Sequence, residues 1–63
     1  MTIKEFDAAS WGANMICDYH GETRKISRVD FLEKLIYMEN EEDEEDEDVA
    51  RCENVANVRF QRS

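Results

Sequence analysis

The chain has 63 residues and a formal net charge of −8, so it holds one domain at most and leaves little room for an extended catalytic cleft. The 16 acidic residues outnumber the 8 Lys and Arg, which disfavours binding to nucleic acid or to an anionic membrane through overall charge. Eight consecutive acids, Glu41 to Asp48, account for the whole excess, since 16 − 8 leaves 8 acids against 8 bases. We therefore expect a non-enzymatic module with a basic partner.

The N-terminal residues and the cysteines bear on the cellular compartment. The first ten residues lack the basic and apolar regions of a secretory signal peptide, and no segment approaches the roughly 20 apolar residues that span a bilayer. We therefore expect a cytoplasmic protein without a membrane partner. In that compartment Cys17 and Cys52 are expected to be reduced, half-buried thiols and not a disulfide.

Residues 1–12 are predicted to form a lead-in arm. Ile3 and Phe6 are three apart, which suits one helical turn or an irregular segment that packs two side chains. Trp11 is followed by Gly12, which marks a change of direction. The indole is expected either at the edge of the core with its N–H satisfied, or at an interface, where Trp is enriched.

A β-hairpin is predicted over residues 13–31. Its first strand, 13–19, alternates with period two, which is typical of a strand with one buried face. Gly21 then supplies the positive φ that a tight turn needs. In the second strand Ile26 and Val29 are out of phase, which predicts a bulge between them. The residues that share a face in the first strand are Ala13, Met15, Cys17 and Tyr19.

Residues 27–39 fit two structures. As a helix, the segment would begin at an N-cap, Ser27, and its apolar residues would line one face. Its β-branched and aromatic residues favour strands instead, and the acids from Glu39 onward would lie at the negative end of the helix dipole without a Gly to close it. We therefore favour a strand that ends near Phe31, a turn, and a second strand over Leu35–Glu39, with the helix as the alternative.

Residues 40–48 form an acidic segment of low complexity that is predicted to be a solvated loop inserted between two strands. The remaining expectations are a strand at 49–52, a tight or 3₁₀ turn at 53–55, a short closing strand at 58–60 and a frayed tail at 61–63. This organisation gives a single small β domain over 13–60.

The layout of the chain resembles small phage and mobile-element proteins of unknown function that have a Src-homology-3-like (SH3-like) barrel. The strings that carry the resemblance are Tyr19 to Glu22, Val29 to Phe31, Leu35 to Glu39, Arg51 to Val55 and Val58 to Phe60. The resemblance implies an all-β, five-stranded SH3-like barrel with the acidic loop as an insertion, and a phage or mobile-element origin. It brings no catalytic residues. The alternative fold is α+β, a β-hairpin with one helix at about 27–39.

The candidate metal ligands and catalytic groups do not have the number or spacing that a metal or catalytic site needs. Cys17 and His20 have the spacing of metal ligands and Cys52 would be a third, but a structural zinc site needs four. The acidic segment lacks the Gly and the regular ligand offsets of a calcium loop. The segment contains no apolar residue that could shift the pKa of a carboxylate, so catalysis by paired carboxylates is not expected. We predict no metal and no cofactor.

Three basic residues, Arg24, Lys25 and Arg28, cluster on the second predicted strand. We expect them to pair with acids across the sheet or to lie below the acidic loop. The alternative is that they contact nucleic-acid phosphates while Tyr19 stacks on a base.

The acidic segment itself supports the leading functional hypothesis. Contiguous carboxylates imitate the charge density of duplex DNA, which carries one charge per about 1.7 Å of its axis. We therefore expect the protein to bind and modulate or inhibit a basic, nucleic-acid-handling host protein, without binding nucleic acid directly. The alternatives are an accessory nucleic-acid-binding barrel and a structural module whose loop only aids solubility. The predicted partner-binding residues are Glu41, Glu42, Asp43, Glu44, Glu45, Asp46, Glu47, Asp48, Trp11, Tyr19 and Tyr37.

Overall fold

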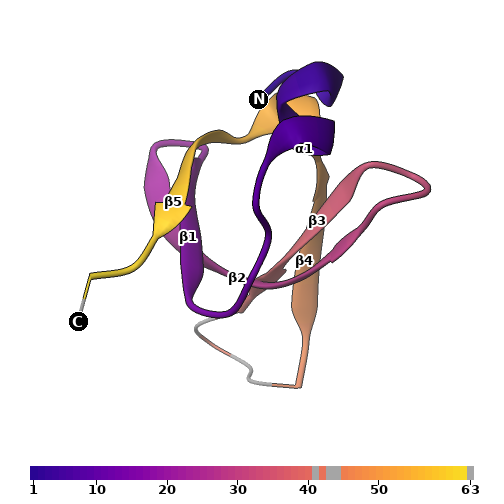
Figure 1. Cartoon of the computed structure of the whole chain (residues 1–63). Helices are drawn as coiled ribbons and strands as arrows, with labels where there is room; N and C mark the ends of the chain where they lie inside the picture. The colour runs from indigo at the N-terminus through magenta and orange to yellow at the C-terminus, as the bar shows by residue number, and fades with distance from the viewer. Residues whose placement is uncertain (41, 43–44, 63) are drawn as a thin grey trace.

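The computed structural model describes residues 1–40, 42 and 45–62, which form five antiparallel strands and one short α-helix (Figure 1). The strand order is β4-β3-β2-β1-β5 in a single sheet. The elements are α1 Ile3–Ala8, β1 Met15–Tyr19, β2 Glu22–Asp30, β3 Leu35–Glu39, β4 Glu47–Arg51, the 3₁₀ turn η1 Cys52–Asn54, and β5 Ala56–Phe60. The all-β prediction is confirmed, and the alternative helix over 27–39 is wrong.

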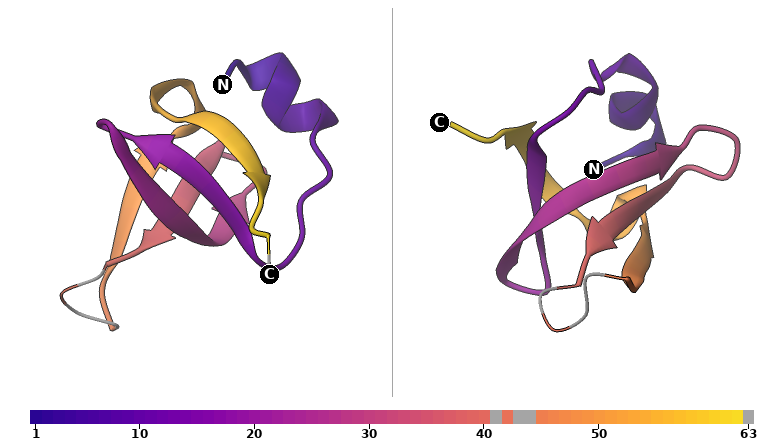
Figure 2. Two further views of the ribbon diagram at one scale, coloured as in Figure 1. Left: turned by 90° about the vertical axis from the view of Figure 1, so that its left-hand side faces the viewer. Right: turned by 90° about the horizontal axis from the view of Figure 1, so that it is seen from below.

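The sheet curves into a small barrel-like fold because β2 belongs to both of its halves (Figure 2). The first half of β2 pairs with β1, for example Cys17 with Arg24, and the second half pairs with β3, for example Val29 with Ile36. The β2–β3 register shifts between Ile26 and Arg28. This shift is the predicted bulge. It allows Ile26 and Val29, which are out of phase in the sequence, to face the same core.

The β1–β2 turn has left-handed backbone at both central residues. His20 has φ 51° and Gly21 has φ 78°, and the turn is flanked by the Tyr19–Glu22 pair. Two positive φ values are the geometry of the type I′ turn, whose twist matches that of antiparallel strands. The predicted role of Gly21 is confirmed, and His20 is an exposed turn residue.

The β2–β3 turn explains why residues 27–39 are not helical. Asp30 Oδ1 accepts hydrogen bonds from the N–H groups of Leu32 at 2.9 Å and Glu33 at 3.1 Å, and Lys34 has φ 59°. Beyond the turn, Ile36 and Met38 are buried in β3 with period two, which a helix would place on different faces.

The core lies inside the curved sheet and is closed at one end by α1. Its buried members are Phe6, Met15, Cys17, Ile26, Ile36, Met38, Ala50, Cys52 and Val55. Cys17 and Cys52 are free thiols with no exposed surface, so the expectation that they are half-buried is wrong. Burial, with a smaller contribution from the Asp18 charge, raises the pKa of the Cys17 thiol.

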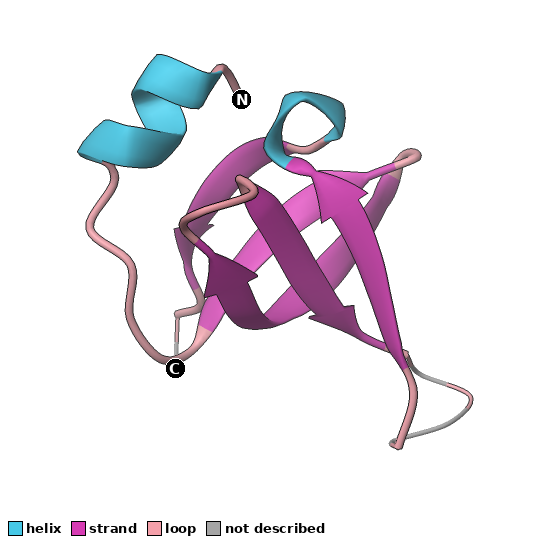
Figure 3. Ribbon diagram, turned by 90° about the vertical axis from the view of Figure 1, so that its right-hand side faces the viewer, coloured by secondary structure: helices cyan, strands magenta, loops and turns pink. Residues whose placement is uncertain are grey.

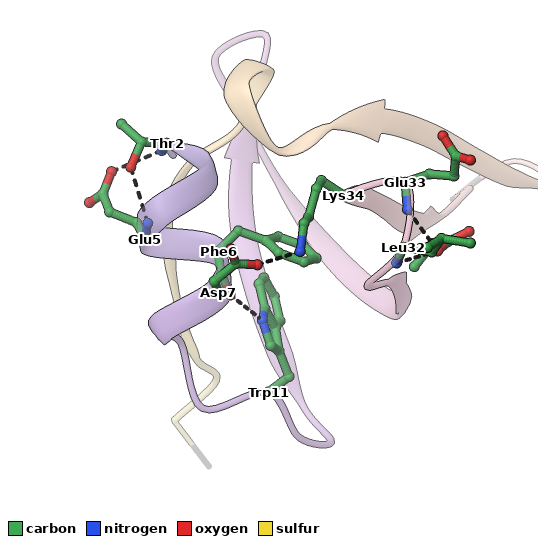
Figure 4. Close-up of polar contacts among 9 residues, drawn as sticks. Thr2, Glu5, Phe6, Asp7, Trp11, Leu32, Glu33 and Lys34 are labelled. Atoms are coloured by element: carbon green, nitrogen blue, oxygen red, sulfur yellow. Dashed lines mark hydrogen bonds and ion pairs between the residues drawn. The ribbon is translucent and has the colours of Figure 1, made fainter.

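The lead-in arm contains α1, whose N-terminus has a capping box. The N–H of Glu5 donates to Thr2 Oγ1 at 3.1 Å, and the N–H of Thr2 donates to Glu5 Oε1 at 2.9 Å (Figure 4). These hydrogen bonds with Thr2 lower the pKa of Glu5. The same helix presents Phe6 to the core, while Ile3 stays exposed. The first twelve residues therefore contribute directly to the hydrophobic core.

The β2–β3 turn also packs against α1 (Figure 4). Lys34 Nζ forms an ion pair with Asp7 and lies 5.5 Å from the centre of the Phe6 ring. The Phe31 ring lies 5.8 Å from the Phe6 ring, centre to centre. Phe6 is therefore held between the sheet and this turn, which fixes the position of the arm.

Strand β4 begins earlier than the sequence predicted. Glu47 and Asp48 pair with Glu39 and Met38 of β3, so the assignment of all of 40–48 to a solvated loop is wrong at these two positions. The turn η1 and strand β5 lie near their predicted places. Gln61 donates its N–H to the Asn14 carbonyl at 2.7 Å, which attaches the start of the predicted tail to the β1 side of the sheet.

Candidate functional site

The acidic segment is fixed at its C-terminal end by two arginines of β2. Arg24 Nη2 lies 2.7 Å from Asp48 Oδ2 and also donates to the Glu39 carbonyl at 3.0 Å. Arg28 Nε lies 3.4 Å from Glu47 Oε2, which also accepts a hydrogen bond from Ser27 Oγ. Both pairs reach from β2 across β3 to β4. The expectation that these arginines pair with acids across the sheet is confirmed.

The other described acids of the segment face solvent. Glu42, Glu45 and Asp46 are exposed, and the N–H of Glu42 donates to Asn40 Oδ1 at 2.9 Å. The remaining predicted binding residues of the segment, Glu41, Asp43 and Glu44, lie outside the described residues.

A polar cleft of about 210 Å³ lies between the segment and the β1–β2 hairpin. Its lining residues are Glu22, Arg24, Asn40, Glu42 and Asp48. The lining contains three carboxylates and one guanidinium, and that guanidinium already pairs with Asp48. The cleft therefore has the charge that suits a Lys or Arg side chain of a partner.

The three predicted aromatic binding residues lie on different elements and are all half-buried. Trp11 donates its indole N–H to the Phe6 carbonyl at 3.0 Å, and the two rings are 5.0 Å apart (Figure 4). The indole N–H is therefore satisfied and the ring packs at the edge of the core, while the expected interface role of Trp11 stays a prediction. Tyr37 lies under the Arg28 guanidinium, 4.2 Å from it, whereas Tyr19 packs against the His20 ring at 4.1 Å.

A second cleft, of about 250 Å³, separates the arm from the bulged part of β2. Residues 11–14 form one wall, and residues 25–29 with Glu39 form the other. Arg28 lines this cleft and also contacts Glu47 and Tyr37, so it connects the cleft to the root of the acidic segment. Sequence reasoning missed the cleft, although the predicted bulge and the change of direction at Gly12 are its two sequence signals.

Asp18 organises a separate polar group that joins β1 to β5. Asn57 Nδ2 donates to Asp18 Oδ2 at 2.8 Å, Arg59 Nη1 lies 3.3 Å from Oδ1, and Thr23 Oγ1 lies 3.4 Å from Oδ1. The hydrogen bond from Asn57, followed by the interactions with Arg59, lowers the pKa of Asp18. We assign this group to the stability of the sheet, because every partner holds neighbouring strands together.

The candidate zinc ligands lie in different surroundings. Cys17 is buried in the core and His20 is exposed in a turn, so two of the three zinc candidates do not converge. In the part of the chain that the structure describes, no three His, Cys, Asp or Glu side chains are placed to hold a metal ion. Its helices likewise include none long and apolar enough to cross a membrane.

Fold and site together define a small, five-stranded antiparallel β protein with an acidic segment held between β3 and β4 by arginines of β2. Comparison with protein-family models, curated proteins and solved structures finds no match.

Proposed function

We propose that this chain is a non-enzymatic binding module that engages a basic, nucleic-acid-handling protein through its acidic β3–β4 connection and modulates or inhibits that protein. The observation that carries the proposal is the pairing of Asp48 with Arg24 and of Glu47 with Arg28. These contacts hold one end of the segment on the rigid sheet, which lowers the entropy that a partner must remove on binding.

The charge distribution supports a basic partner. Beyond the two paired acids, Glu42, Glu45 and Asp46 are exposed, and Glu42 also lines the polar cleft. A dense group of like charges attracts an oppositely charged surface at long range, which speeds association and makes it sensitive to salt. Surfaces that bind the phosphates of nucleic acids are rich in Lys and Arg.

The cleft beside Trp11 supplies a means of specificity. Arg28 lies between this cleft and the acidic segment, so a partner that contacts the acids also meets the half-buried indole and Tyr37. Aromatic side chains in partly closed surroundings contribute strongly to interface affinity. Salt-sensitive attraction by the acids and shape recognition at Trp11 would then act on the same partner.

The alternative of direct nucleic-acid binding is less well supported. It relies on the basic residues Arg24, Lys25 and Arg28, together with Tyr19. The guanidinium groups of the two arginines lie beside the Asp48 and Glu47 carboxylates. Phosphate binding by these arginines would require breaking both contacts within a strongly acidic surface.

The test compares two variants that lose the same number of charges. One is Glu42→Gln with Asp46→Gln, and the matched control is Glu33→Gln with Glu53→Gln, all at exposed positions. Each variant is immobilised and used to capture proteins from host lysate at low and high salt, with and without duplex DNA as competitor.

We expect the wild type and the control to capture the same nucleic-acid-handling protein. The captured protein should be released by salt and displaced by duplex DNA, and the first variant should capture much less of it. Equal capture by both variants, or capture that DNA leaves unchanged, would refute the proposal.

A further inference from the structure

One edge of the sheet is open. In the described part of the chain β4 pairs with β3 alone, and Figure 3 shows β4, the strand that leads into η1, at the margin of the sheet. An unpaired edge presents N–H and C=O groups that can accept a further strand.

The register identifies which groups of β4 face outward. Cys52 donates its N–H to the Lys34 carbonyl at 3.1 Å, which continues the β3–β4 register as a hydrogen-bonded pair. Hydrogen-bonded and non-bonded pairs alternate along an antiparallel ladder. The backbone groups of Asp48 and Ala50 therefore face β3, and those of alternate residues face away from it. The outward-facing residues are Glu47, Val49 and Arg51.

Two other contacts agree with this assignment. Tyr37 and Glu39 of β3 stand opposite Val49 and Glu47, respectively. The Tyr37 carbonyl accepts a hydrogen bond from Ser27 Oγ at 3.1 Å, and the Glu39 carbonyl accepts one from Arg24 Nη2 at 3.0 Å. Both carbonyls therefore face β2, so these β3 residues turn their backbone groups away from β4.

We propose that this edge pairs with the same edge of a second copy of the chain, in an antiparallel arrangement about a twofold axis at Val49. In this register all three outward-facing residues meet outward-facing residues, which allows about six backbone hydrogen bonds between the copies. Val49, which is 50% exposed, meets its own counterpart, and Glu47 of each copy stands opposite Arg51 of the other. Both cross-strand charge pairs are thus attractive.

The charges also disfavour other pairings of the two edges. A parallel arrangement would place Glu47 and Asp48 beside the same acids of the second copy, where like charges are destabilising. The antiparallel arrangement instead directs the two acidic segments to opposite ends of the dimer. This inference does not depend on the proposed function, because of the acidic segment it uses only the start of β4, at Glu47 and Asp48, and not the exposed acids Glu42, Glu45 and Asp46.

Sedimentation equilibrium and amide hydrogen exchange test the dimer directly. Both are measured from about 10 μM to about 1 mM protein, because a dimer with a small interface is expected to dissociate within this range. We expect the mass to rise towards twice 7.4 kDa. The amides of Glu47, Val49 and Arg51 should become protected over the same range, while those of Asp48 and Ala50 stay protected throughout. A constant monomer mass, or a doubled mass with rapid exchange at the three outward amides, would overturn the proposal.

Charge reversal gives an independent test. Arg51→Glu should weaken dimerisation about tenfold or more, because two attractive pairs become repulsive, whereas Arg62→Glu makes the same charge change outside β4 and should not. The conservative variant Arg51→Lys keeps opposite charges across the axis and leaves Glu47 with Arg28, so it should retain the dimer. Circular dichroism confirms that each variant is folded. Equal dimerisation of Arg51→Glu and Arg51→Lys would contradict the register.

Discussion

Arg24 and Asp48 are joined by an ion pair of 2.7 Å that reaches from β2 to β4 across the intervening strand. The Arg24 side chain is 13% exposed, whereas the Asp48 side chain is 48% exposed. A largely covered guanidinium thus holds a carboxylate that remains accessible to solvent. This contact allows β4 to begin with two acidic residues, Glu47 and Asp48.

Removal of the Arg24 guanidinium should therefore destabilise the protein. We expect Arg24→Met, which keeps most of the aliphatic stem, to lower the free energy of unfolding by about 1–2 kcal/mol, because charge-assisted hydrogen bonds to Asp48 and the Glu39 carbonyl are lost. Urea denaturation followed by circular dichroism measures the change. Arg62→Met at an exposed position is the control and should have little effect. Equal stabilities of the two variants would show that the pair does not hold β4.

Phe6 should be indispensable although it lies outside the sheet. Phe6→Ala removes a side chain with no exposed surface and should cost about 3–5 kcal/mol, which is comparable to the whole stability of a domain this small. Ile3→Ala changes the same helix at a side chain that is 47% exposed, and it should cost much less. We expect thermal melting to lose cooperativity in the first variant only. A cooperative melt of Phe6→Ala would mean that the arm is dispensable for the fold.

The β1–β2 turn should depend on the absence of a side chain at Gly21. A Cβ at this position would meet no atom within 4 Å, so the cost of Gly21→Ala arises from its φ of +78° and not from a clash. We expect a loss of about 1 kcal/mol in unfolding free energy. His20→Asn should keep or raise the stability, because Asn-Gly is the preferred type I′ pair. The prediction fails if chemical denaturation finds Gly21→Ala as stable as wild type.

Asp18 should make stability sensitive to acid. Its pKa is lower in the folded state, chiefly through the hydrogen bond from Asn57 and then through Arg59. Its contribution to the free energy of unfolding is therefore complete above the unfolded-state pKa of about 4. The contribution is lost as the pH falls through the lower, folded-state pKa. We expect the urea midpoint of wild type to fall more steeply between about pH 5 and pH 2 than that of Asp18→Asn. Glu53→Gln, at an exposed position, should retain the wild-type slope, and a parallel pH profile for Asp18→Asn would rule out this role.

Local patterns in the sequence predicted the central part of the fold. Three features can be predicted from neighbouring residues alone, because they follow from local periodicity and turn residues. They are the alternation of Met15 and Cys17, the turn at Gly21 and the phase change after Ile26. The helix α1 also had a local signal, because Thr2 and Glu5 have the spacing of a capping box. The spacing of Ile3 and Phe6 alone indicates no more than one helical turn, so the capping box is the stronger signal.

The start of β4 had no local signal. Residues 40–48 are strongly acidic, and like charges alone favour a solvated loop. Glu47 and Asp48 enter the sheet because Arg28 and Arg24, which are far away in the sequence, lie two strands away. The cleft beside Trp11 has two local signals, the bulge and the change of direction at Gly12, but neither shows that the arm lies across the β2 bulge.

The sharing of β2 between both halves of the sheet determines how the protein can open. Among the described residues, β4 and β5 each pair with one neighbour, β3 and β1, whereas β2 is paired along its length on both sides of the bulge. An outer strand can therefore detach while the centre stays intact, which is the behaviour of a structure with regions of unequal local stability. The ion pairs of Arg24 and Arg28 oppose such opening at β4, because each of them ties β4 directly to β2. The two arginines therefore keep the start of β4 on the sheet.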